Sequence, residues 1–325
     1  MSAIALAVAL VGSALVVPLS VSAQQVVTLK FSHEAPETAI KGRSAKLLAE
    51  LVEKYTQGTV KVQVFPGGQL IPTNEELRAA IRGQVDIVAP YSSYFASLDP
   101  GWSVFYQPML FKTVEEGMNA YNGPVGAELL QRLESKGLKG LSMWHDGPVY
   151  AFTTGNAALT PENYKGMKVR VAASKPQEAL LAKVGATPIS MPATEVYLAL
   201  QQGVMSGVIT TPTYAAPARW GEVLRFMVRT SWGMGGYGVA MNKRSWEKLS
   251  ANQQEGFMKA VREAEAWNRG QSTQNIKDSE AALEKAGLKL VDPTQEQAAA
   301  WEALAKPIWD AQPDETKNLT QMLRR

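Results

Sequence analysis

A single arginine lies inside a short segment whose neighbours alternate as in a β-strand. In KGMKVRVAAS, residues 165–174, Val169 and Val171 share one face of the predicted strand and Arg170 lies on the other. A guanidinium stays charged at all ordinary pH values, and its planar fork matches a carboxylate through two parallel hydrogen bonds. Arg170 is therefore a candidate carboxylate-binding residue. The alternative is that this face of the strand is simply solvated.

Further candidates follow other predicted strands, at the points where those strands end. Aromatic rings there can stack on a ligand or form an apolar wall, and hydroxyl groups can donate hydrogen bonds to it. The candidates are Tyr91, Ser92, Trp144, Tyr150, Thr210, Tyr214 and Trp220. Each aromatic residue has the alternative of a place in the hydrophobic core, and for Trp144 and Trp220 the two interpretations are equally supported.

The patterns of the common enzyme classes do not occur in the sequence. There is no Gly-x-Ser-x-Gly elbow, no phosphate-binding loop, no His-Glu-x-x-His and no calcium loop. The segment GMGGYG, residues 233–238, matches the dinucleotide fingerprint, but it runs into the strand-like YGVAMN instead of opening a helix. We interpret it as a flexible crossing between lobes, and we predict a binding protein without a cofactor.

An exported enzyme acting on an organic acid stays open as an alternative, because Asp, Glu, Tyr and Lys chemistry leaves no linear motif. A metal site is not predicted. The chain has no cysteine, and its two histidines, His33 and His145, lie far apart in the sequence.

The overall composition is that of a globular protein. The 325 residues are 46% hydrophobic, and 33 basic residues against 30 acidic ones give a net charge of +3. Such a balance provides no basic surface for nucleic acid. Residues 1–29 carry no charged side chain and include Val21-Ser22-Ala23, so we predict a signal peptide over 1–23 and export to the periplasm. An uncleaved membrane anchor is the alternative.

The remaining pattern predicts an α/β protein with two lobes. Strand-like and helix-like segments alternate over 26–93 and again over 137–211, which favours two sheets, parallel or mixed, with a cleft at their strand ends. Residues 250–286 have helical composition interrupted only by Gly256 and Gly270, and at 1.5 Å per residue such a helix is long enough to span both lobes.

One segment carries a specific resemblance. Residues 166–207, GMKVRVAASKPQEALLAKVGATPISMPATEVYLALQQGVMSG, contain Gly-x-Lys-x-Arg, Gly-Ala-x-Pro-x-x-Met and Glu-x-Tyr-x-Ala-Leu-Gln in order. This resembles the solute-binding proteins of tripartite ATP-independent periplasmic (TRAP) transporters, the DctP family. Further matches are FPGGQL (65–70), RGQVDI (82–87), QPMLF (107–111) and VGAELLQRLESKGL (125–138).

The resemblance implies a two-lobed fold of the type II periplasmic-binding-protein kind, with a central cleft that closes over a small organic acid. The acid would be delivered to a sodium-driven permease made of two membrane subunits. The family's carboxylate-binding arginine falls on Arg170. We expect lobe I over 24–147 plus about 236–270, and lobe II over 148–235 plus about 271–325. A binding protein for an ATP-driven importer is the alternative partner assignment.

The chain departs from the family pattern at two places. Members that bind dicarboxylates often continue with Asp-Gly-Gln-Glu-Asn-Pro, whereas this chain has SGVITT at 206–211, so that Thr210 replaces an asparagine. Those members also tend to carry a second arginine where this chain has Val149 or Tyr150. One cationic group in place of two predicts a monocarboxylate ligand, with aromatic or hydroxylated character.

Overall fold

The computed structural model describes residues 26–324, and the predicted signal peptide lies outside them. Within these residues the chain forms two mixed β-sheets. The first contains, in spatial order, β2 (Val60–Phe65), β1 (Val27–Ser32), β3 (Ile87–Val88), β10 (Met234–Asn242) and β4 (Leu138–Pro148). Here β1 pairs in parallel with β2 and β3, and β10 is antiparallel to β3 and β4. The predicted parallel or mixed sheet is confirmed.

The second sheet holds the strand with the candidate arginine. Its spatial order is β11 (Lys289–Val291), β9 (Phe226–Val228), β5 (Tyr150–Thr153), β8 (Gly207–Thr210), β6 (Lys168–Val171) and β7 (Thr187–Ser190). Strand β6 lies between β7 and β8 and is parallel to both, while β5 is antiparallel to β8 and β9. Strand β6 is thus an interior strand, in which Val169, Arg170 and Val171 are buried and Lys168 is exposed.

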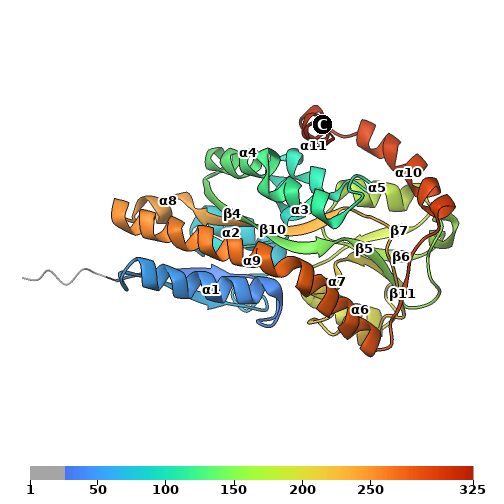
Figure 1. The fold of residues 1–325 in the computed structure, drawn as a ribbon, viewed down its shortest axis with the longest axis horizontal. Helices are drawn as coiled ribbons and strands as arrows, with labels where there is room; N and C mark the ends of the chain where they lie inside the picture. The colour runs from blue at the N-terminus through green and yellow to red at the C-terminus, as the bar shows by residue number, and fades with distance from the viewer. Residues whose placement is uncertain (1–25, 325) are drawn as a thin grey trace, which may run out of the picture.

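Helices surround the two sheets (Figure 1). They are α1 (Ile40–Tyr55), α2 (Glu76–Arg82), α3 (Val114–Asn122), α4 (Pro124–Arg132), α5 (Lys175–Lys183), α6 (Ala193–Gln201), α7 (Pro212–Ala215), α8 (Lys243–Glu247), α9 (Ala251–Lys285), α10 (Gln295–Asp310) and α11 (Asp314–Leu323). In the described part of the chain, no helix combines the length and the apolar character that a membrane crossing requires.

The predicted long helix is α9, a continuous helix of 35 residues. It begins with a capping box in which Ser250 and Gln253 bond each other's backbone N–H groups. A stripe of buried residues that includes Phe257, Val261 and Leu283 runs along one side. Gly256 is accommodated because it lies against the carbonyl of Tyr55, where an added Cβ would come within 2.6 Å of that oxygen.

Helix α9 connects the two halves of the molecule. Figure 1 shows it packed along α1 at one end and continuing past the second sheet at the other. In its middle, the Asn268 amide accepts a hydrogen bond from the His145 backbone N–H at 2.7 Å and donates one to the Ser44 hydroxyl at 3.1 Å. Asn268 of α9 therefore links β4 to α1. The link lies near the end of β4, where the chain leaves the first sheet for β5 of the second.

The two C-terminal helices return across the molecule. In α10, Trp301 donates to the Leu159 carbonyl at 2.9 Å, and in α11, Thr316 donates to the Pro100 carbonyl at 2.9 Å. Helix α11 thus packs on a segment that we assigned to lobe I, although we expected residues 271–325 to belong to lobe II. The division into lobes follows the two sheets, and its exact boundaries stay a prediction.

The glycine-rich segment 233–238 differs from its expected role. We interpreted it as a flexible crossing, but five of its six residues, Met234–Gly238, lie in β10, where they are buried. The glycines are needed because neighbours approach closely: a Cβ on Gly235 would lie 2.2 Å from the Tyr91 hydroxyl, and one on Gly236 would lie 2.7 Å from the Trp144 carbonyl. Only Gly233, with φ of +119°, has a backbone conformation that favours glycine.

Candidate functional site

Arg170 lies in the interior of the protein, between the two sheets. Its side chain is 2% exposed, and its Nε and Nη2 donate to the Met191 carbonyl at 3.1 and 2.9 Å. Met191 directly precedes Pro192, the N-cap residue of α6. The segment that leads into this helix therefore fixes the position of the guanidinium. No carboxylate within residues 26–324 lies within ion-pair distance of Arg170. The edge formed by Nη1 and the second Nη2 hydrogen is left for another acceptor.

Arg170 is one wall of a narrow cavity with about 350 Å³ of empty volume. The cavity is tight, because only about 20 Å³ of it is open to the centre of a water-sized sphere. Segments of both sheets contribute to it, as expected for loops that follow strand ends. The lining residues are Glu34, Thr73, Tyr91 and Tyr94 on the side of the first sheet, and Arg170, Ala172, Ala193, Ile209, Thr210 and Tyr214 on the side of the second. Of the predicted residues, the structure brings Arg170, Tyr91, Thr210 and Tyr214 together here.

The other predicted residues lie elsewhere. Ser92 is buried and bonds the hydroxyls of Tyr106 and Tyr121 at 2.7 Å each. Trp144 packs in the first lobe's core, 6.1 Å from the Phe31 ring. Trp220 is buried behind Tyr214, with ring centroids 5.4 Å apart.

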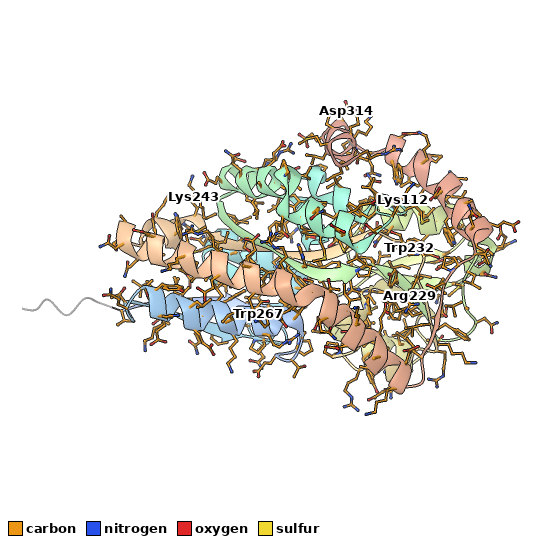
Figure 2. The ribbon with its side chains drawn as sticks, viewed as in Figure 1. Lys112, Arg229, Trp232, Lys243, Trp267 and Asp314 are labelled. Carbon is orange, nitrogen blue, oxygen red and sulfur yellow. The ribbon has the colours of Figure 1, made fainter. Side chains whose placement is uncertain are left out.

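Tyr150 and Arg229 line a separate pocket. Figure 2 labels Arg229, which lies beside the second half of α9. Arg229 is held there by Glu280 and Asp292, at 2.7 and 3.1 Å. Burial raises the pKa of Tyr150 to about 12, so the Tyr150 hydroxyl stays protonated. None of Ser92, Trp144, Tyr150 and Trp220 lines the cavity.

A buried ion pair stands opposite Arg170, and we did not anticipate it from the sequence. Glu34 follows β1 and lines the cavity, and Lys41 is in the first turn of α1. The Lys41 Nζ donates to Glu34 and, at 2.9 Å, to the Ala89 carbonyl; it also lies 4.0 Å from the ring centre of Tyr237. The two side chains are 0% and 3% exposed. The available signal was the position of Glu34 at the end of the first strand.

A second unanticipated carboxylate joins the two lobes near the cavity. In the pairing of β10 with β4, Gly235 faces Gly147 and Gly236 faces His145, so Asp146 occupies a β-bulge. The bulge directs the buried Asp146 carboxylate to Thr211 and Thr213, whose hydroxyls donate to it at 2.5 and 2.7 Å. Burial raises the pKa of Asp146, and the two threonine hydrogen bonds lower it. These contacts link the end of β4 to the segment after β8.

Glu76, the first residue of α2, is the third carboxyl group in this region. It is 0% exposed, and among the described residues neither of its oxygens has a hydrogen-bond partner. Burial and the nearby Glu34 carboxylate raise the pKa of Glu76 well above its usual range, and Lys41 opposes the shift. Glu76 therefore keeps its neutral form to a higher pH than an exposed glutamate does. No group of three or more His, Cys, Asp or Glu residues in 26–324 is arranged to hold a metal ion.

This shift predicts a pH effect on stability. Between the ordinary glutamate pKa of about 4.3 and the raised value, the folded state binds more protons at Glu76 than the unfolded state does. The contribution of Glu76 to the free energy of unfolding should therefore fall as pH rises through that window. Glu76→Gln removes this dependence, so its stability relative to wild type should increase from pH 5 to pH 8. Urea unfolding at several pH values tests this, and a constant difference would contradict it.

Comparison with known proteins places the chain in a family. Residues 31–315 match the family model described as "Bacterial extracellular solute-binding protein, family 7", DctP. The C4-dicarboxylate-binding periplasmic protein DctP of Rhodobacter capsulatus is 36% identical over 307 residues, covering 93% of this chain and 92% of the relative. The chain belongs to this family.

Solved structures agree with the assignment. A TRAP periplasmic solute-binding protein from Shewanella oneidensis with bound succinate has a TM-score of 0.87 and 28% identity, over 92% of this chain and 98% of that one. A Pseudomonas aeruginosa protein with bound L-malate has a TM-score of 0.83 and 26% identity, over 87% and 99% of the two chains. As a DctP-family member, the chain is a TRAP-type solute-binding protein and not an enzyme. The two-lobed fold class predicted from the sequence is confirmed.

Proposed function

We propose that this DctP-family protein binds a monocarboxylate whose carboxylate group pairs with Arg170. The observation that carries the proposal is a buried guanidinium that lines a cavity and, among the described residues, meets no carboxylate. Burying an unpaired charge is unfavourable, and an anionic ligand removes that cost. The other nearby cation, Lys41, is already neutralised by Glu34. One uncompensated positive charge therefore suits one negative charge on the ligand.

The remaining walls suggest the chemical character of the acid. Tyr91, Tyr94 and Tyr214 present aromatic surface, and Thr73 and Thr210 present hydroxyl groups. Two hydroxyl oxygens of these side chains, Thr73 Oγ1 and Tyr91 Oη, are buried without a hydrogen-bond partner among the described residues. Buried polar groups are normally paired, so a ligand hydroxyl or carbonyl could satisfy them. An aromatic or hydroxylated monocarboxylate fits both features.

A dicarboxylate is the second candidate, favoured by the similarity to proteins named or solved with C4-dicarboxylates. In this chain its second carboxylate would meet Glu34. Calorimetry with butyrate, lactate, 4-hydroxybenzoate, succinate and malate separates the two candidates. We expect a monocarboxylate to bind at least about tenfold more tightly than succinate or malate, equivalent to about 1.4 kcal/mol. Preferential binding of succinate or malate would reject the monocarboxylate proposal.

We further propose that the protein is exported, with cleavage near Ala23, and that it delivers its ligand to the two membrane subunits of a TRAP transporter. Family membership supports both proposals, because the family is one of extracellular binding proteins. The absence of charged residues before Lys30 and the Val21-Ser22-Ala23 sequence support cleavage by signal peptidase. Mass spectrometry of the N-terminus of the secreted protein identifies the cleavage position.

A further inference from the structure

We propose that Glu34 is a specificity-determining residue: it acts as a built-in carboxylate that occupies Lys41 and thereby keeps a second ligand carboxylate out of the cavity. The inference rests on the proposed binding of a carboxylate by Arg170. It goes further by assigning the choice between one and two carboxylates to a particular residue on the opposite wall.

The charges around the cavity carry the first step. Two buried cations lie in this region, Arg170 on the second-sheet side and Lys41 on the first-sheet side. They are in different states, because Arg170 has only the Met191 carbonyl as an acceptor, whereas Lys41 has the Glu34 carboxylate. Without the charge of Glu34, the positive charge of Lys41 would be unpaired behind the wall opposite Arg170, and a positive charge near each end of the cavity suits a dicarboxylate.

The geometry of the pair carries the second step. Glu34 lines the cavity and Lys41 does not, so a ligand meets the carboxylate and not the ammonium. Lys41 is fixed by the Ala89 carbonyl at 2.9 Å and by the Tyr237 ring at 4.0 Å, which leaves Glu34 as its anionic partner. A second ligand carboxylate at this end would lie beside a like charge in a buried environment, which is strongly unfavourable.

The neighbouring Glu76 does not take Lys41 away from this pair. It is buried near Glu34 and Lys41, and among the described residues neither of its carboxyl oxygens has a hydrogen-bond partner. Within residues 26–324, Lys41 therefore has Glu34 as its one carboxylate partner.

Glu34→Gln tests the inference, because glutamine keeps the size of the side chain and removes its charge. The probes are succinate and butyrate, which have the same chain length, measured by calorimetry with the full-length mature protein. We expect the ratio of succinate to butyrate affinity to rise at least about tenfold in Glu34→Gln. Glu34→Asp keeps the charge and should retain the wild-type ratio of succinate to butyrate affinity. That result would assign the effect to the charge of the side chain.

A matched control exists in the same loop. Glu37 is exposed and does not line the cavity, so Glu37→Gln makes the same charge change without the proposed effect. An unchanged ratio in Glu34→Gln overturns the inference, as does an equal change in Glu37→Gln or a failure of Glu34→Gln to bind succinate. If Arg170→Ala still abolishes acid binding, only the inference on Glu34 has failed. If Arg170→Ala leaves binding intact, the proposed function has failed as well.

Discussion

Replacing Arg170 with alanine should weaken ligand binding by about 2–5 kcal/mol, or roughly 30- to 4,000-fold. The loss is large because the ligand carboxylate would lie in the cavity without its cationic partner. Arg170→Lys should also bind weakly, because an ammonium cannot reproduce the planar pair of N–H donors and cannot keep both bonds to Met191. Calorimetry with the tightest-binding acid of the panel measures both effects.

Arg225 provides the control for this prediction. Its side chain bonds the Leu224 carbonyl at 3.2 Å, and it does not line the cavity. Arg225→Ala removes the same charge and should leave the affinity within about twofold of wild type. Wild-type affinity in Arg170→Ala would remove Arg170 from the site, provided that thermal unfolding shows the variant to be folded.

Replacing Lys41 with methionine should destabilise the fold by about 3–5 kcal/mol, the usual cost of removing one partner from a buried ion pair. The side chain of Lys41 is fully buried and serves both Glu34 and the Ala89 carbonyl. Its loss leaves Glu34 without a cation. Urea unfolding near pH 8 measures the effect, and the double variant Lys41→Met with Glu34→Gln should recover most of the loss because the orphaned charge is gone.

A surface pair serves as the comparison. Lys61 and Glu53 are 3.0 Å apart and each 52% exposed, so Lys61→Met should cost no more than about 1 kcal/mol. If Lys41→Met is no more destabilising than Lys61→Met, the buried pair is not the structural element described above. The inference on Glu34 would then also lose its basis.

The sequence predicted the fold well because hydrophobic periodicity is a local property. The alternation in β6 correctly placed Val169 and Val171 opposite Arg170, and the long helical segment appears as α9. The glycines of 233–238 were wrongly interpreted as a flexible crossing, because glycine occurs both where the backbone is flexible and where neighbours leave no room for a side chain. Only the three-dimensional arrangement shows that Tyr91 and the Trp144 carbonyl approach Gly235 and Gly236.

The site was predictable only in part. A position at the end of a strand predicts that a residue lies near the cleft, but it does not predict whether its side chain points into the cleft or into the core. The bulge at Asp146 changes which side chains of β4 face the core and which face the second lobe, because a shift of one residue reverses the faces of a strand. Trp144 accordingly points into the core near Phe31, while Asp146 points to Thr211. Glu34 and Lys41 are ordinary charged residues by sequence, and their burial depends on packing against distant segments such as β10.

A crystal structure of the protein with the acid that binds it most tightly tests the central claim most directly. We predict one ligand carboxylate bonded to the Nη1 and Nη2 edge of Arg170 at about 2.7–2.9 Å, with the rest of the acid against Tyr91 and Tyr214 and the Glu34–Lys41 pair intact. A ligand whose carboxylate binds elsewhere, with Arg170 contacting only Met191, would contradict the account.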